Sequence, residues 1–184
     1  MTGVQTCALP ICIEQVLPWY AVPTADQVAV RQVDLFAARG QSEPVAIAVH
    51  ALRDVKAVSV TCGPLTSTDG TIPAAAITSR LSLAYTTEPR GRGTIDTRQM
   101  LLLAVEGWTI PRAQTCEWII DVHVPVNATA GRYRGTITVT VAGQPAAEIA
   151  LTLEVLDFVL TDNGCRWGAD RKSTRLNSSH GKLS

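Results

Sequence analysis

Three carboxylates stand in strand-like text where acid–base chemistry would be sought: Asp121, Glu148 and Glu154. Hydrolysis by paired carboxyl groups needs two of them held a few ångströms apart on a rigid site. Each of the three alternates with apolar neighbours, which places it on the outward face of a strand, where a charge usually serves solubility. The sequence therefore predicts no catalytic residue in this chain.

Metal and nucleophile chemistry have no better support. His50 and His123 also alternate outward, and neither has an acidic or cysteine partner at metal-ligand spacing. Four cysteines, none in a Cys-x-x-Cys pair, lie between the chain ends: Cys12, Cys62, Cys116 and Cys165. Their disulfide state stays open. Without a Gly-x-Ser-x-Gly elbow or a phosphate-cradling glycine loop, we expect no metal and no cofactor.

Two tryptophans in loop-like text, Trp19 and Trp108, are the candidates for binding carbohydrate, because an indole ring offers a large apolar surface with a polar edge. Trp118 differs, since it alternates inward within its strand and is expected in the core. Nothing in the sequence places a groove beside Trp19 or Trp108, so a packing role for both stays open.

The elements that would position these residues are strands. Trp118 to Val124, Tyr133 to Val141 and Ile149 to Val155 each alternate apolar and polar residues, and the last two are joined by turn residues as a hairpin. Thr129-Ala130-Gly131-Arg132-Tyr133 places a glycine two residues before a tyrosine at a strand entry. This spacing is typical of the tyrosine corner of sandwich domains, in which the phenol bonds back to the preceding turn.

Upstream, the same pattern predicts further strands at residues 28–35, 45–51, 55–60, 77–85 and 101–105, separated by glycine and proline turns. Residues 88–97 read as a long surface loop. No segment has a helical period beyond about two turns. About eight short strands of this kind predict an all-β, antiparallel β-sandwich of the immunoglobulin-like type.

Composition excludes several partners. The chain has 184 residues, with 16 lysines and arginines against 16 aspartates and glutamates, and is 46% hydrophobic. This balance is typical of a globular protein and argues against a nucleic-acid partner. No run of about 18 apolar residues occurs, so no membrane span is predicted.

The two ends of the chain are related through their codons. Residues 1–11 (MTGVQTCALPI) and residues 170–180 (DRKSTRLNSSH) can be encoded by opposite strands of one DNA segment. The codon GAT for Asp170 complements ATC for Ile11, for example, and the complementarity continues through every position of both stretches. The stretch resembles a translated sequencing adapter, so residues 1–11 and 170–184 are expected to be non-native.

Residues 12–169 are then expected to be one domain, cut from a longer protein whose signal peptide and true ends are unknown. Leaving out the two ends removes four basic residues and one acidic residue, which leaves 12 basic against 15 acidic residues and a net charge of −3.

Within residues 121–160, the text VPVNATAGRYRGTITV precedes LEVLDFVL. It resembles the "VPxxAxxGxYxGTxTV" strand-turn-strand and the "LxVxxFxLP" exit of the N-terminal β-sandwich domain of family 123 glycoside hydrolases and related secreted bacterial proteins. Residues 36–45 (FAARGQSEPV) are similar to that domain's "ArGExE" strand-turn, and residues 72–74 (IPA) to its "IPa" lead-in. Together these motifs cover most of residues 33–161.

The resemblance implies an extracellular or periplasmic parent in which the sandwich supports a following TIM barrel. That barrel cleaves β-linked N-acetylhexosaminides by a substrate-assisted mechanism with an adjacent Asp-Glu pair. Residues 12–169 hold no such pair, so the barrel is the expected intramolecular partner, missing here. The alternative is an immunoglobulin-like adhesion or carbohydrate-binding module of a surface protein, with Trp19 or Trp108 facing a glycan. Docking on a barrel predicts an exposed apolar patch.

Overall fold

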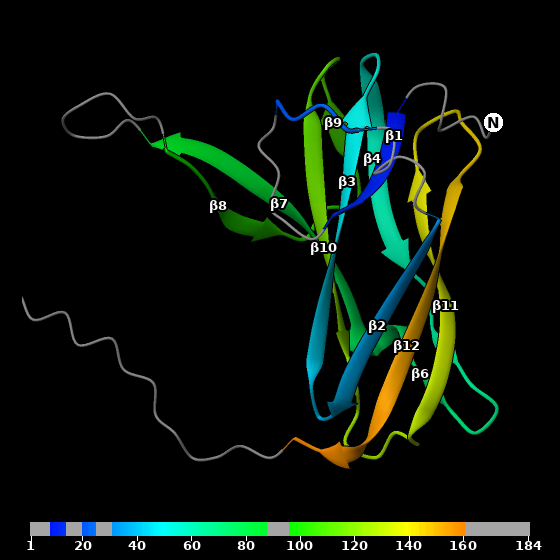
Figure 1. Ribbon diagram of the computed structural model, residues 1–184. Coiled ribbons are helices and arrows are strands. Elements are labelled where there is room, and N and C mark those ends of the chain that lie inside the picture. The colour runs from blue at the N-terminus through cyan, green and yellow to red at the C-terminus, as the bar shows by residue number, and fades with distance from the viewer. Residues whose placement is uncertain (1–7, 14–19, 25–30, 88–95, 161–184) are drawn as a thin grey trace, which may run out of the picture.

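The computed structural model of the chain describes residues 8–13, 20–24, 31–87 and 96–160, and side chains within residues 20–24, 31–83 and 101–160 (Figure 1). Two β-sheets pack against each other. The five-stranded sheet has the order β1 (Ala8–Ile13), β3 (Ser42–Ala51), β10 (Thr115–His123), β7 (Ile77–Thr87) and β8 (Asp96–Leu103).

The seven-stranded sheet has the order β2 (Gln32–Arg39), β12 (Ala147–Val159), β11 (Gly131–Thr140), β4 (Val55–Cys62) and β9 (Trp108–Ile110), with β5 (Leu65–Thr66) and β6 (Thr71–Ile72) beside β11. A short 3₁₀ helix, η1 (Ala74–Ala76), leads into β7. The predicted all-β sandwich is confirmed. No helix in the described ranges is long and apolar enough to cross a membrane.

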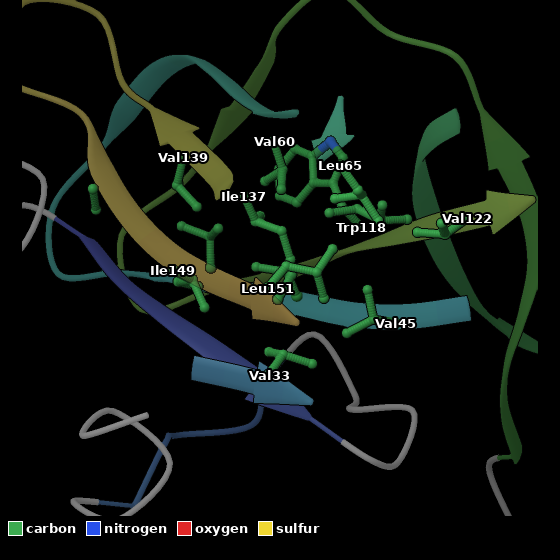
Figure 2. Packing of buried hydrophobic residues seen from close by; sticks show 14 of the residues in the cluster. Val33, Val45, Val60, Leu65, Trp118, Val122, Ile137, Val139, Ile149 and Leu151 are labelled. Atoms are coloured by element: carbon green, nitrogen blue, oxygen red, sulfur yellow. The ribbon is translucent and has the colours of Figure 1, made fainter. Parts of the chain in front are cut away.

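The core lies between the inner faces of the two sheets, where side chains from alternate positions meet. Figure 2 shows Trp118 of β10 among side chains of the opposite sheet, near Leu65 and Ile137. Trp118 is buried, as predicted. The labelled residues of this core are Val33, Val45, Val60, Leu65, Trp118, Val122, Ile137, Val139, Ile149 and Leu151.

The predicted hairpin is confirmed as β11 and β12, which pair antiparallel with Ile137 opposite Ile149. The tyrosine corner at its entry is confirmed as well. The buried Tyr133 hydroxyl donates a 2.9 Å hydrogen bond to the backbone oxygen of Thr129. Gly131 between them has φ +141°, a backbone conformation that a residue with a side chain rarely adopts.

A close contact fixes the middle of β11. Gly135 lies under Leu65 of β5, and a Cβ atom at position 135 would stand 2.2 Å from Leu65 Cδ2. Leu65 itself is fully buried. The leucine side chain therefore fills the space that the glycine leaves open, which is a common reason for a glycine inside a strand.

Several predicted boundaries are wrong. β2 continues to Arg39 instead of ending at Leu35, because it pairs in parallel with β12, and this pairing outweighs the weak strand propensity of Ala37 and Ala38. Among the described strand pairs this is the parallel one, and the others are antiparallel. β8 begins at Asp96, so the end of the predicted loop is strand, while residues 88–95 lie outside the described ranges.

The short strands β1, β5, β6 and β9 were not predicted. β9 includes Trp108, which stands opposite Val58 of β4, so this tryptophan lies in a strand and not in a loop. β4 is irregular there, since its register shifts between Val55 and Val58, and Ala57 has φ +49°. A bulge of this kind breaks the simple alternation that sequence patterns depend on.

Candidate functional site

Trp108, a candidate for sugar binding, is half-buried and packs against the hydrophobic core. Its indole group forms a hydrogen bond with the thiol of Cys116 on β10. Burial raises the pKa of Cys116 to about 11, and the bond from Trp108 acts in the opposite direction. Trp108 thus stands on β9 with part of its indole packed on the core of the sandwich. Trp19 lies outside the described residues.

The three carboxylates considered first do not form a pair. Glu148 and Glu154 are exposed on β12, six residues apart along one strand. At about 3.4 Å per residue they are roughly 20 Å apart, far beyond the 5–10 Å or so that glycosidase carboxylates require. Asp121 lies on β10 of the other sheet. Their positions suit solvated surface charges, as the alternation predicts.

His123 and His50 behave differently from each other. His123 is exposed, with Nδ1 3.2 Å from Ser42 Oγ. His50 also points away from the core, yet it is buried. Both histidines therefore point outward from the core, as predicted, but only His123 reaches solvent. No group of three or more metal-ligating side chains occurs in the described part of the chain.

A segment of chain explains the burial of His50. Thr115 stands opposite His50 in the register of β10 and β3. The Thr115 hydroxyl donates a 2.6 Å hydrogen bond to the backbone oxygen of Ala21, in the segment Tyr20–Thr24. Because that hydroxyl has a single proton, it accepts the 2.9 Å bond from His50 Nδ1. His50 and Thr115 thus hold this segment on the outer side of the sheet.

Two more polar residues lie buried on this outer face. Glu117 and Ser82 stand opposite each other on β10 and β7, in the same row of side chains as Ala48. Neither residue was predicted as a site residue. The alternation of Thr115 and Glu117 with Trp118 places them on the outer face, but no pattern in the sequence shows that this face is covered. These buried polar residues include one carboxylate, Glu117, and one imidazole, His50. The hydrogen bonds described for His50 and Thr115 hold the segment Tyr20–Thr24 on the sheet.

The outer face of the seven-stranded sheet carries an open hollow of about 580 Å³. Its polar lining comes from β2, β11 and β12, and consists of Gln32, Asp34, Arg132, Arg134, Thr152 and Glu154. Acidic and basic side chains alternate across it, with Arg132 directly opposite Glu154. The described lining has no aromatic ring on which a sugar could stack, so this hollow lacks the main feature of a carbohydrate platform.

Exposed apolar side chains gather where β12 ends. We call Val126, Phe158, Val159 and Leu160 the exit-end cluster, and their exposed fractions lie between 38% and 58%. Val126 Cγ2 and the Leu160 backbone oxygen both lie beside Gly40 in the turn between β2 and β3. The surface at this end of the molecule is therefore not uniformly polar.

This end of the molecule is tied together through its backbone. Gly40 N–H donates to Val124 O at 2.8 Å, and Leu160 N–H donates to Arg39 O at 2.9 Å. The Arg39 guanidinium also contacts the Asp157 carboxylate at 3.2 Å. Three chain segments thus hold the exit-end cluster in a fixed arrangement, which lowers the conformational entropy that a docking partner would have to remove.

Comparison with known proteins gives a structural likeness without a sequence family. No family model matches the chain, and no curated protein matches its sequence. A family 123 glycoside hydrolase from Clostridium perfringens is similar in structure with a TM-score of 0.64 and 18% identity, over 70% of this chain and 23% of that chain. The match shows a shared fold, and the chain spans about a quarter of that hydrolase.

Two other solved structures are more distant. The CfaE adhesin of enterotoxigenic E. coli matches with a TM-score of 0.43 and 14% identity, over 85% of this chain and 51% of that chain. A Bacteroides ovatus GH5 xyloglucanase matches with a TM-score of 0.33 and 11% identity, over 68% of this chain and 17% of that chain. TM-scores this low do not establish a common fold.

Proposed function

We propose that residues 12–169 are a non-catalytic β-sandwich domain of a glycoside hydrolase similar to family 123, and that the domain supports a catalytic barrel that follows it. The observation that carries this proposal is the exit-end cluster. Exposed apolar side chains stand at the place where β12 leaves the sandwich, and this is where a following domain first meets it. On this proposal residues 1–11 and 170–184 are foreign to the protein.

The fold likeness supports the same proposal. The part of the Clostridium perfringens hydrolase that the chain matches is 23% of that protein, which leaves room there for a separate catalytic domain. The described carboxylates of this chain are spread over two sheets and form no catalytic pair. A supporting role accounts for a fixed, apolar end and for the lack of reactive groups in the described part of the chain.

Docking would be driven by removing the exit-end cluster from water. Each large apolar side chain that becomes fully buried contributes roughly 1.5–3 kcal/mol. Because the backbone hydrogen bonds at Gly40 and Leu160 already fix the cluster, little further ordering is needed. The barrel would in turn be held in one orientation relative to the sandwich.

Sequencing of the source DNA tests the parentage. Long reads primed within the codons for residues 118–155 and extended outward should continue past Ala169 into a barrel with adjacent Asp and Glu. If the frame instead stops soon after Asn163 or enters another β-module, the proposal fails. Glycan binding by the sandwich would then be the function to examine.

The two-domain protein obtained in this way tests the role of the exit-end cluster. Phe158→Ser should lower the temperature at which the barrel loses its activity, because an apolar docking contact is replaced by a polar one. Phe36→Ser is the matched control, since Phe36 is 67% exposed against 51% for Phe158 and stands on the outer face of β2 opposite Glu154. Equal effects of the two substitutions would contradict docking at the exit end.

The placement of Trp108 bears on the alternative, glycan binding through Trp19 or Trp108. An indole that packs on the core and bonds Cys116 has less of its face available for a sugar. Under the supporting role, Trp108→Ala and Trp19→Ala leave retention of the chain on immobilised glycans unchanged. Loss of retention in either variant would favour the binding module instead.

A further inference from the structure

β1 forms the edge of the five-stranded sheet, and β3 is its strand neighbour in the described residues. Six consecutive residue pairs join the two strands without a shift, from Ala8 opposite Ala51 to Ile13 opposite Ala46. Figure 1 shows β1 running beside β3, on the side away from β7 and β8. The outer edge of β3 is thus matched by β1 over the whole of this length.

β3 is buried on both faces along this edge. Ile47 and Val49 on the core side are 0% exposed, and Ala48 and His50 on the other side are 0% and 6% exposed. A strand with apolar surroundings and unpaired main-chain groups is a ready template for another strand. Without β1, this edge would therefore present unpaired main-chain groups of a largely apolar strand to another strand.

A proline inside β1 indicates how the ladder is arranged. Pro10, opposite Val49, has no N–H and is accommodated only where the backbone faces away from the partner strand. Successive residues of an antiparallel pair alternate between facing the partner and facing away. The main-chain N–H and C=O groups of Leu9, Ile11 and Ile13 then face β3. Those of Cys12, like the main chain of Pro10, face away from β3.

The origin of β1 indicates that its sequence was not selected for pairing with β3. Residues 8–11 belong to the stretch whose codons complement those of residues 170–180, so most of the strand comes from a segment expected to be foreign to the domain. A segment of this origin can pair only through features that any extended apolar chain offers. Main-chain hydrogen bonding to a sheet edge is such a feature.

We propose that the outer edge of β3, from Ala46 to Ala51, is a strand-accepting site for an extended apolar peptide of about six residues. In this chain the chain's own Ala8–Ile13 fills the site. The site differs from the exit-end cluster in position and in ligand, and of its supporting arguments only the foreign origin of residues 8–11 rests on the proposed function.

Amide hydrogen exchange on two matched variants tests the site. Ile11→Pro removes an N–H from the phase that faces β3, and we expect the amides of Ala46, Ala48 and His50 to exchange at least about tenfold faster. A synthetic peptide of residues 8–13 added in excess should restore their protection. Cys12→Pro is the control, because it places the same residue in the phase that already holds Pro10, and protection should stay unchanged.

The amides of Ile120 and Leu151 report whether the sandwich stays folded, since both residues lie in the core between the sheets. They should remain protected in both variants. Unchanged exchange of the β3 amides in Ile11→Pro would overturn the proposal. So would a failure of the peptide to restore protection while the core amides remain protected.

A disulfide test identifies the occupant without weakening β1. Ile13→Cys and Ala46→Cys place two thiols opposite each other in the register, and Cys12→Ala removes the competing neighbour. Oxidation should give a monomer with the 13–46 disulfide, located by peptide mapping. A disulfide-linked dimer would mean that a second copy supplies the strand and would overturn the assignment to the chain's own segment. Absence of the disulfide would overturn the pairing itself.

Discussion

The outer faces of the two sheets differ, although both follow the same alternation of residues. On the seven-stranded sheet Asp34 and Glu154 are exposed to solvent. On the five-stranded sheet Thr115 and Glu117 are buried, and Thr115 donates a hydrogen bond to Ala21 in the segment Tyr20–Thr24. The difference teaches that alternation tells which face of a sheet a side chain is on, but not whether that face meets water.

The largest loss of stability should come from a substitution in the core between the two sheets. Trp118→Ala leaves a cavity in the core and should lower the free energy of unfolding by about 3–5 kcal/mol. Phe36→Ala also removes an aromatic side chain, but this one is exposed on the outer face of β2. It should change the free energy of unfolding by no more than about 0.5 kcal/mol. Urea unfolding measures both, and similar losses would mean that the outer face of β2 is covered.

A smaller effect tests whether the outer faces differ energetically. Thr115→Val removes the donor to Ala21 and the acceptor of the His50 bond, leaving a half-buried carbonyl and a buried imidazole without these partners. We expect a loss of about 1–3 kcal/mol. Thr136→Val, at an exposed position of β11, should be almost neutral. Equal losses of stability from the two substitutions, measured by urea unfolding, would mean that the outer faces of the two sheets do not differ energetically.

The tyrosine corner should contribute less than the covered threonine. Tyr133→Phe keeps the buried ring and removes only the hydrogen bond to Thr129, so the free energy of unfolding should fall by about 0.5–1.5 kcal/mol. Thermal unfolding followed by circular dichroism measures the change. A loss as large as that of Trp118→Ala would mean that the hydroxyl has a further role in holding the turn.

The smallest effects concern one thiol in each sheet. Burial raises the pKa of Cys62 on β4 and of Cys116 on β10 from 9.0 to about 11. Below pH 9 both thiols are neutral in the folded and the unfolded chain. Between pH 9 and 11 the unfolded chain loses these protons first, so their contribution to stability disappears as the pH rises through this window.

Unfolding midpoints between pH 8 and 11 should therefore fall less in the Cys62→Ala and Cys116→Ala double variant than in the unmodified chain. Alkylation kinetics read by peptide mapping can separate the two sheets. Trp108→Phe removes the bond that lowers the pKa of Cys116, so Cys116 should react more slowly at pH 10 while Cys62 is unaffected. An equal change at both thiols would indicate a general loosening of the fold.

Sequence patterns predicted the parts of the fold that local residues determine. The hairpin of β11 and β12 and the bond of Tyr133 follow from alternation and turn residues close together in the chain. The extension of β2 through Ala38 could not be read in this way, because it depends on parallel pairing with a strand far along the sequence. Long-range pairing is outside the reach of local propensity.

The candidate surfaces were predictable to different degrees. The need for an apolar patch followed from the resemblance, but its location depends on three segments that meet at Gly40. The burial of His50 and Thr115 goes with a segment that bonds to the outer side of the sheet at Ala21, and nothing in their own strands indicates it. Trp108 was predicted in a loop, and the strand it belongs to was not recognised because its partner strand β4 is irregular at Ala57.

The parallel pairing of β2 with β12 sets the order of events during synthesis. β2 leaves the ribosome well before β12, so the two strands cannot pair, and the seven-stranded sheet cannot close, until β12 has emerged. At about 5–20 residues per second, β2 waits several seconds for its partner. During that time the edge of β2 that pairs with β12 in the folded sheet has no native partner strand, and an unpaired strand edge is prone to aggregation.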